Sequence, residues 1–142
     1  MALAEQQALK ATKKIIAELK MRYERSVKKQ TGFMLKLNEK QLDQGKKNND
    51  NPITPFYTDA YAKKKKRNIP DLKDTGDFRD SFYIDVNQSG LNYWATDEKT
   101  TFLAEKYTTD IFGLTEDNAI IAFGRVFKPV NKFVNGTVSK YL

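Results

Sequence analysis

Two groups of charged residues have the types and spacing that could support chemistry. The first is a set of aspartates that recur at every third residue, and carboxylates are the ligands that Mg²⁺ and Ca²⁺ prefer: Asp71, Asp74, Asp77 and Asp80. No Asp-x-Asn-x-Asp-Gly loop surrounds them. Their spacing therefore favours a solvated turn followed by the start of a strand, and we expect no metal ion and no cofactor.

The second group is a run of cations that could neutralise phosphates of DNA or contact an acidic protein: Lys63, Lys64, Lys65, Lys66 and Arg67. The run has no interleaved aromatic residues for base stacking, although Tyr57 and Tyr61 lie close in sequence. A solvated basic loop or a contact with a protein partner is the favoured interpretation, and a non-specific DNA contact is the second.

Two residue types that many catalytic sites use are absent from the sequence, which limits the reactions that the chain could catalyse. The chain contains no His and no Cys, which excludes an imidazole base, a thiolate nucleophile and the usual zinc ligands. Carboxylate pairs remain, namely Glu105 with Asp110 and Glu116 with Asp117. No aromatic-lined cleft can be argued around them, so we interpret them as surface charges. The chain is expected not to be an enzyme.

The charge of the chain is unevenly distributed. Of the 142 residues, 30% are charged, 39% hydrophobic and 12% aromatic, which predicts one modest core that leans on partner subunits. Residues 1–70 carry 17 Lys and Arg against 7 Asp and Glu, whereas residues 71–142 carry 8 against 11. Opposite charges in the two halves suit head-to-tail association between copies, and a basic N-terminal helix could equally face nucleic acid.

Targeting signals are not evident. The first 14 residues lack an uninterrupted apolar stretch, so a signal peptide is not expected. The longest apolar-rich stretch covers residues 119–123, far below the ~20 residues that a membrane span needs. We therefore expect no membrane contact and assembly in the cytoplasm.

A long helix is predicted over residues 4–29, with Gly32 as a stop signal. Its apolar face follows helical spacing and comprises Leu9, Thr12, Ile16, Leu19, Tyr23 and Val27. The alternation in residues 33–38 predicts a short strand, and residues 39–45 predict a brief helical turn closed by glycine.

Local signals place the next elements. We expect a surface loop over residues 46–58, followed by a helix over 59–67 that Thr58 caps. An antiparallel hairpin should follow, with strands 81–86 and 91–96 joined by a turn at 87–90. A helix over 102–107 comes next. Thr115 is expected to cap a further helix.

The segment from residue 125 to 142 places a set of side chains on one helical face: Val126, Val130, Phe133, Val134, Val138 and Tyr141. Pro129 and Gly136 weaken the helix prediction. The face is either part of the core or a candidate subunit interface, and the sequence leaves both open. Together these elements predict an α+β fold with short C-terminal helices, divided into a basic helix (1–30), a core (31–124) and a C-terminal tail (125–142).

The segment LKDTGDFRDSFYI is the most informative motif. Thr75, Gly76 and Asp77 form its predicted structural turn, in which glycine permits a positive φ. Leu72, Phe78 and Phe82 should then anchor its flanks in the core. The element carries no reactive group and positions the hairpin that follows.

Residues 32–118 resemble the virion-morphogenesis and tail-completion proteins of tailed bacteriophages. The resemblance rests on FMLKLNEKQLDQG, NPITPFYTDAYAKK, LKDTGDFRDSFYI and LAEKYTTDIFGLTEDN, of which the third is the most specific. Its matching positions are Leu72, Thr75, Gly76, Phe78, Ser81 and Phe82. The N-terminal helix and the C-terminal tail lie outside the resemblance, and the lysine run is longer than the family pattern expects.

This resemblance implies a structural role at the head–tail junction of a virion. It implies a neck or tail-completion subunit that forms a homo-oligomeric ring and docks to portal, connector, neck or tail proteins. The alternative is a basic nucleic-acid-binding module that contacts DNA through the N-terminal helix and residues 63–67.

Overall fold

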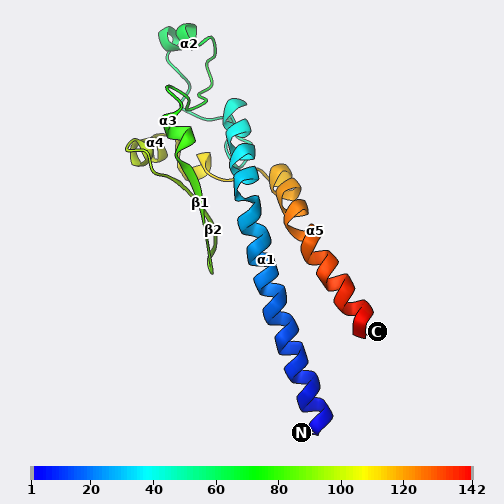
Figure 1. Ribbon diagram of the computed structural model, residues 1–142. Coiled ribbons are helices and arrows are strands. Elements are labelled where there is room, and N and C mark those ends of the chain that lie inside the picture. The colour runs from blue at the N-terminus through cyan, green and yellow to red at the C-terminus, as the bar shows by residue number, and fades with distance from the viewer. Residues whose placement is uncertain (1, 142) are drawn as a thin grey trace. The chain divides into compact units, whose positions relative to one another are not determined.

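The computed structural model describes residues 2–141, except for the side chain of Tyr141. The chain forms two compact units. The helical unit combines the segment up to Gln30 with the segment from Phe123 onward, and the α+β unit comprises residues Thr31–Ala122. The mixed α+β fold class is confirmed (Figure 1).

The first helix is longer than predicted. Helix α1 spans Leu3–Asp43, so the strand expected over residues 33–38 is wrong, and Gly32 lies inside the helix rather than ending it. The buried positions in this part follow helical spacing, and they are Met34, Leu37, Asn38, Gln41 and Leu42. Because two of these five are polar, the sequence signal for a helix was weak. Gly45, with a φ of 71°, follows the helix as the closing glycine that was predicted.

The remaining elements of the α+β unit include the predicted helix after Thr58, the predicted hairpin and the predicted helix near residue 102, together with two short helices that were not predicted. They are α2 (Asp59–Lys65), α3 (Asp77–Asp80), β1 (Phe82–Asn87), β2 (Gly90–Ala95), α4 (Thr100–Tyr107) and the 3-10 helix η1 (Thr109–Ile111). The hydroxyl of Thr58 accepts from the backbone N–H of Tyr61, which confirms the predicted cap. The hairpin pairs Phe82 with Ala95 and Asn87 with Gly90.

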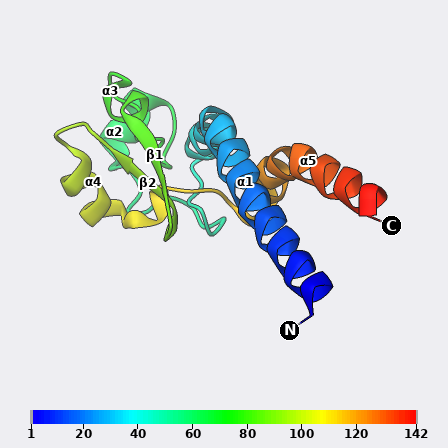
Figure 2. The same ribbon diagram turned by 60° about the horizontal axis from the view of Figure 1, so that its bottom comes forward.

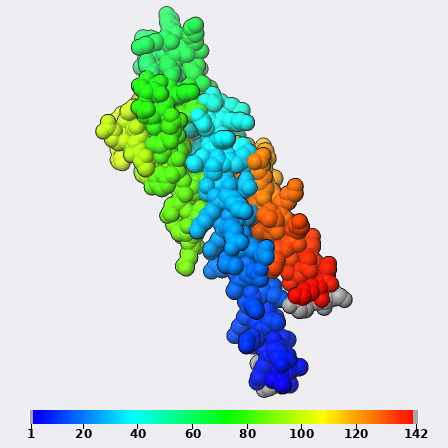
Figure 3. All heavy atoms as spheres, viewed as in Figure 1, coloured from blue at the N-terminus to red at the C-terminus, as the bar shows by residue number. Residues whose placement is uncertain are grey.

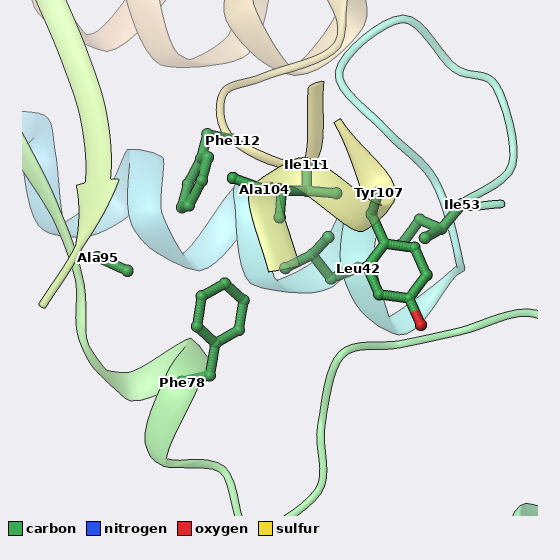
Figure 4. Close-up of a cluster of buried hydrophobic side chains, with 8 residues drawn as sticks. All are labelled: Leu42, Ile53, Phe78, Ala95, Ala104, Tyr107, Ile111 and Phe112. Atoms are coloured by element: carbon green, nitrogen blue, oxygen red, sulfur yellow. The ribbon is translucent and has the colours of Figure 1, made fainter. Parts of the chain in front are cut away.

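The core of the α+β unit is small and aromatic. Figure 4 shows its buried side chains, which come from α1, the loop after it, α3, β2, α4 and η1: Leu42, Ile53, Phe78, Ala95, Ala104, Tyr107, Ile111 and Phe112. The ring of Phe82 packs on this cluster, with its centroid 5.0 Å from that of Phe78 and 4.8 Å from that of Phe112. One face of the hairpin is therefore held in the core while the alternate side chains of β1 are exposed.

The helical unit is built by the N-terminal part of α1 and most of α5 (Glu116–Tyr141). The two helices expected after residue 115 and after residue 125 are one helix, so the prediction of short C-terminal helices is corrected. Pro129 and Gly136 do not interrupt it. Pro129 is exposed, where water can satisfy the carbonyl that loses its N–H partner.

Candidate interaction sites

The predicted structural turn adopts the expected conformation. Gly76 has a φ of 95°, in the left-handed region that favours glycine. The hydroxyl of Thr75 accepts from the backbone N–H of Asp77 at 3.3 Å, and the Gly76 carbonyl accepts from the N–H of Asp80 at 2.9 Å. The turn starts α3, whose Phe78 side chain is buried. It thereby fixes where β1 begins, as the sequence predicted.

This turn also lines a cavity of about 470 Å³ in the α+β unit. Three segments form the walls, namely residues 56–61, residues 72–78 and residues 99–107. The aromatic and aliphatic lining residues are Phe56, Tyr57, Tyr61, Leu72, Phe78, Leu103 and Tyr107. The charged lining residues are Lys73, Lys99 and Lys106, with Asp74 as the single carboxylate, and all four are exposed. The cavity is an apolar hollow with a basic rim. We call it the aromatic pocket.

An ion cluster centred on Asp71 supports one wall of the pocket. The carboxylate lies 3.6 Å from the Lys65 ammonium and 3.5 Å from the Arg67 guanidinium. Burial opposes its ionisation, but the Lys73 N–H and the charges of Lys65, Arg67 and Arg79 outweigh that effect and lower its pKa. The phenol of Tyr57 lies 3.4 Å from the same carboxylate, and burial raises the pKa of Tyr57 to about 12. Tyr57 is therefore neutral at physiological pH.

The candidate DNA-contact run divides into two groups. Lys65 and Arg67 are half-buried and bind Asp71, and Arg67 also donates to the carbonyl of Asp43 at 3.0 Å. Lys63, Lys64 and Lys66 are exposed. Lys66 follows α2 in the left-handed conformation, with a φ of 59°. Only three of the five cations are thus presented to a partner.

Arg79 is a structural residue that sequence reasoning missed. Its side chain is 2% exposed and reaches Asp43 at 2.7 Å and Glu39 at 3.3 Å, both on α1. It also donates to the carbonyls of Glu39 and Asp71. Its Nε is buried and, among the described residues, has no hydrogen-bond acceptor. The only sequence signal was a cation within an otherwise acidic stretch.

Two buried amides of α1 organise the segment between η1 and α5. Asn38 donates to the carbonyl of Ile111 at 3.1 Å and accepts from the N–H of Gly113 at 3.0 Å. Gln41 donates to the Gly113 carbonyl at 2.9 Å, and its carbonyl accepts from the Thr115 N–H at 2.9 Å. The same oxygen accepts from the Asn118 side chain at 2.7 Å. These bonds, which we call the amide clamp, satisfy backbone groups where the chain turns into α5. Sequence reasoning missed them as well.

The candidate interface on α5 separates into core and surface. Val126 and Val130 are buried in the helical unit, and the Val126 carbonyl accepts from the Ser26 hydroxyl at 2.6 Å. Phe133 is half-buried beneath the guanidinium of Arg22, 4.3 Å from its ring centroid. Val134 and Val138 are exposed. The side chain of Tyr141 lies outside the described residues.

Further exposed apolar residues lie on both helices of this unit. They are Leu3, Leu9, Ile16 and Met21 on α1 and Phe127 on α5. Leu9 and Ile16 had been predicted to belong to the apolar face of the first helix, and the structure leaves both exposed. Figure 3 draws the atoms on one face of both helices, blue for the start of α1 and orange to red for α5.

The two units differ strongly in charge. The helical unit contains 12 Lys and Arg against 3 Glu, a net charge of +9, and the α+β unit contains 13 against 15, a net charge of −2. The sequence halves had suggested such an asymmetry. The folded chain places residues 123–141, which carry four cations and no acid, with the basic N-terminal segment.

The carboxylates predicted to be surface charges are distributed along the α+β unit. Glu116 and Asp117 are exposed in the first turn of α5, where their negative charges interact favourably with the helix dipole. Within the described range, no group of three or more carboxylates is arranged to hold a metal ion. No helix formed by residues 2–141 has the length and apolarity needed to cross a membrane.

Comparison with known proteins adds no assignment. No protein-family model, no curated protein and no solved structure matches this chain. Any functional interpretation therefore rests on the residues and the geometry described above.

Proposed function

We propose that this chain is a structural subunit of a tailed bacteriophage virion. It acts as a neck or tail-completion protein at the head–tail junction, where copies assemble into a ring and dock to portal, connector or tail proteins. The family resemblance motivates this proposal, and its most specific element is the turn at Thr75 and Gly76, which sets the start of the hairpin. A turn of this kind shapes a surface and carries out no reaction.

The observation that carries the proposal is the row of exposed apolar side chains on the helical unit. On α5, Phe127 and Val134 are seven residues apart and Val138 follows after four, so they lie along one side of the helix. The buried seam of the same unit is narrow, with Val27, Val126 and Val130 as its buried apolar residues. Exposed apolar side chains on one side of a helix are typical of protein interfaces, and burying them between subunits would stabilise this pair of helices.

Assembly can be measured directly. Native mass spectrometry and sedimentation across a concentration series should show oligomers, and Val134→Glu should shift them toward monomer because it introduces a charge into the apolar row. Ser139→Glu is the matched control, because residue 139 is also exposed on α5 but lies on another side of the helix. A chain that stays monomeric at high concentration and ignores phage neck proteins would contradict the proposal.

A second candidate function is non-specific DNA contact, favoured by the net charge of the helical unit and by the exposed Lys63, Lys64 and Lys66. Replacing Lys63, Lys64 and Lys66 with Gln tests whether these exposed lysines contact DNA. Removing each phosphate contact should flatten the dependence of log K on log salt by about 0.9. A decrease in slope near 3 with unchanged assembly would make DNA contact the main function. Failed assembly with unchanged DNA binding would support the structural role.

A further inference from the structure

We propose that the aromatic pocket binds the first turns of α5 from a second copy of the chain. This inference rests on the proposed ring assembly and names the contact through which copies join. It is distinct from the apolar row on the helical unit, because both partners in the contact belong to the α+β unit.

The pocket combines an apolar and aromatic lining with exposed cations. Its volume of about 470 Å³ lies within the range of ~300–1,000 Å³ that is common for ligand pockets. The rings of Tyr57 and Tyr61 meet edge to face with their centroids 4.8 Å apart, which gives the lining a rigid aromatic corner. Lys99 precedes α4 directly and Lys106 lies in its last turn, and both are exposed. An occupant should therefore combine apolar side chains with carboxylates.

The start of α5 offers that combination. Glu116 and Asp117 are exposed acids, and one turn later Ile120 and Ile121 are 66% and 52% exposed. Residues 107–124 contain no Lys or Arg, so the carboxylates here have no neighbouring cation in the sequence. The isoleucines would enter the aromatic hollow while the carboxylates face the lysines on the rim. Charge complementarity of this type fixes partner choice and register.

The arrangement suits contact between copies rather than within one. In both ribbon views, α4 lies on one side of the C-terminal part of α1 and the start of α5 lies on the other (Figures 1 and 2). Each copy therefore presents a pocket on one side and an acidic end on the opposite side. A contact between unlike surfaces repeats from copy to copy, and it closes into a ring when the rotation permits.

Charge reversal on each partner surface tests the contact in the full-length chain. The pocket variant is Lys99→Glu with Lys106→Glu, and the end variant is Glu116→Lys with Asp117→Lys. Each variant alone should associate about tenfold or more weakly than the wild type, because like charges then face each other. An equimolar mixture should recover association, because every pocket can then meet an end of opposite charge.

The matched control is Lys36→Glu with Lys40→Glu, which makes the same charge change on positions of α1 outside the pocket and should assemble like the wild type. Thermal unfolding of every variant shows whether the fold is kept. Variants that assemble normally would overturn this contact while leaving ring assembly through another surface intact. Weak variants that the mixture fails to rescue would show that pocket and end are not partners. A wild-type chain that remains monomeric would contradict ring assembly itself.

Discussion

The two units of this protein use their helices in opposite ways. In the α+β unit, α1 contributes buried apolar residues and two amides whose polar atoms all meet partners on the segment between Ile111 and Asn118. In the helical unit, the same helix buries a narrow seam and leaves Leu9, Ile16 and Met21 exposed. The net charge is −2 in the first unit and +9 in the second.

This contrast separates the residues that define the fold from the residues that form a binding surface. Buried polar groups that are fully satisfied define one arrangement of the backbone, because any alternative leaves them without partners. Exposed apolar residues and unbalanced charge do little to define a fold and are the usual properties of binding surfaces. We expect substitutions in the amide clamp to affect folding and substitutions on the exposed helical faces to affect association.

The largest effect should follow from breaking the amide clamp. Gln41→Ala leaves the carbonyl of Gly113 and the N–H of Thr115 without their partner, and we expect the free energy of unfolding to fall by about 3 kcal/mol. Urea unfolding followed by circular dichroism measures the change. Lys40→Ala, at an exposed neighbouring position of α1, should change it by less than about 0.5 kcal/mol. If both variants lost the same free energy of unfolding, the amide clamp would not stabilise the fold as proposed.

The next prediction compares a buried and an exposed position of α5 within the helical unit. Val126→Ala creates a cavity in the buried seam and should cost about 2 kcal/mol of stability. Val134→Ala, eight residues later on the exposed side, should leave stability within about 0.5 kcal/mol of the wild type. Thermal or urea unfolding of the pair measures both. If Val134→Ala proved the more damaging, the division of this helix into core and surface would be wrong.

A smaller effect is expected at the turn of the α+β unit. Gly76→Val should lower stability by about 1–2 kcal/mol, because valine resists the positive φ. The cause is backbone strain rather than a clash, since a Cβ at this position would come no closer than 3.6 Å to the Asp80 carboxylate. Asp77→Asn should be tolerated, because the side chain is exposed. Equal small effects in thermal unfolding would contradict the role of this glycine.

The smallest effect concerns the charge of Asp71. Its pKa is lowered in the folded state, so it contributes stability above its unfolded pKa of about 3.9 and loses that contribution as pH falls through the folded value. Asp71→Asn should therefore cost about 1 kcal/mol at pH 7 and progressively less as the pH falls below about 3.9. Unfolding measured across this pH range gives the difference. Asp85→Asn, on an exposed position of β1, is the control and should track the wild type.

Elements with local signals were predicted well from the sequence. The Thr58 cap, the hairpin and the glycine turn at residue 76 depend on residues within a few positions of each other. The C-terminal part of α1 and the continuity of α5 were missed because tertiary packing decides them. Asn38 and Gln41 are buried only because the segment near Gly113 accepts and donates to them, and the sequence alone gives no sign of that partner.

The candidate site was predicted in part for the same reason. The turn and the lysine run were identified, but the aromatic pocket combines residues 56–61, 72–78 and 99–107 and becomes visible only when these segments meet. The predicted interface on α5 contained both buried and exposed positions. Periodicity identifies the side of a helix that is apolar but cannot say how much of it a neighbouring helix covers.

The division of the helical unit between residues 2–30 and residues 123–141 has a consequence for the kinetics of folding. Ser26 and Val126, which are joined by a hydrogen bond, are 100 positions apart in the sequence. Bringing two such distant segments together costs loop-closure entropy before any contact between them is made. The contact order of the helical unit is therefore high, and we expect this unit to form more slowly than the hairpin and the local turns of the α+β unit.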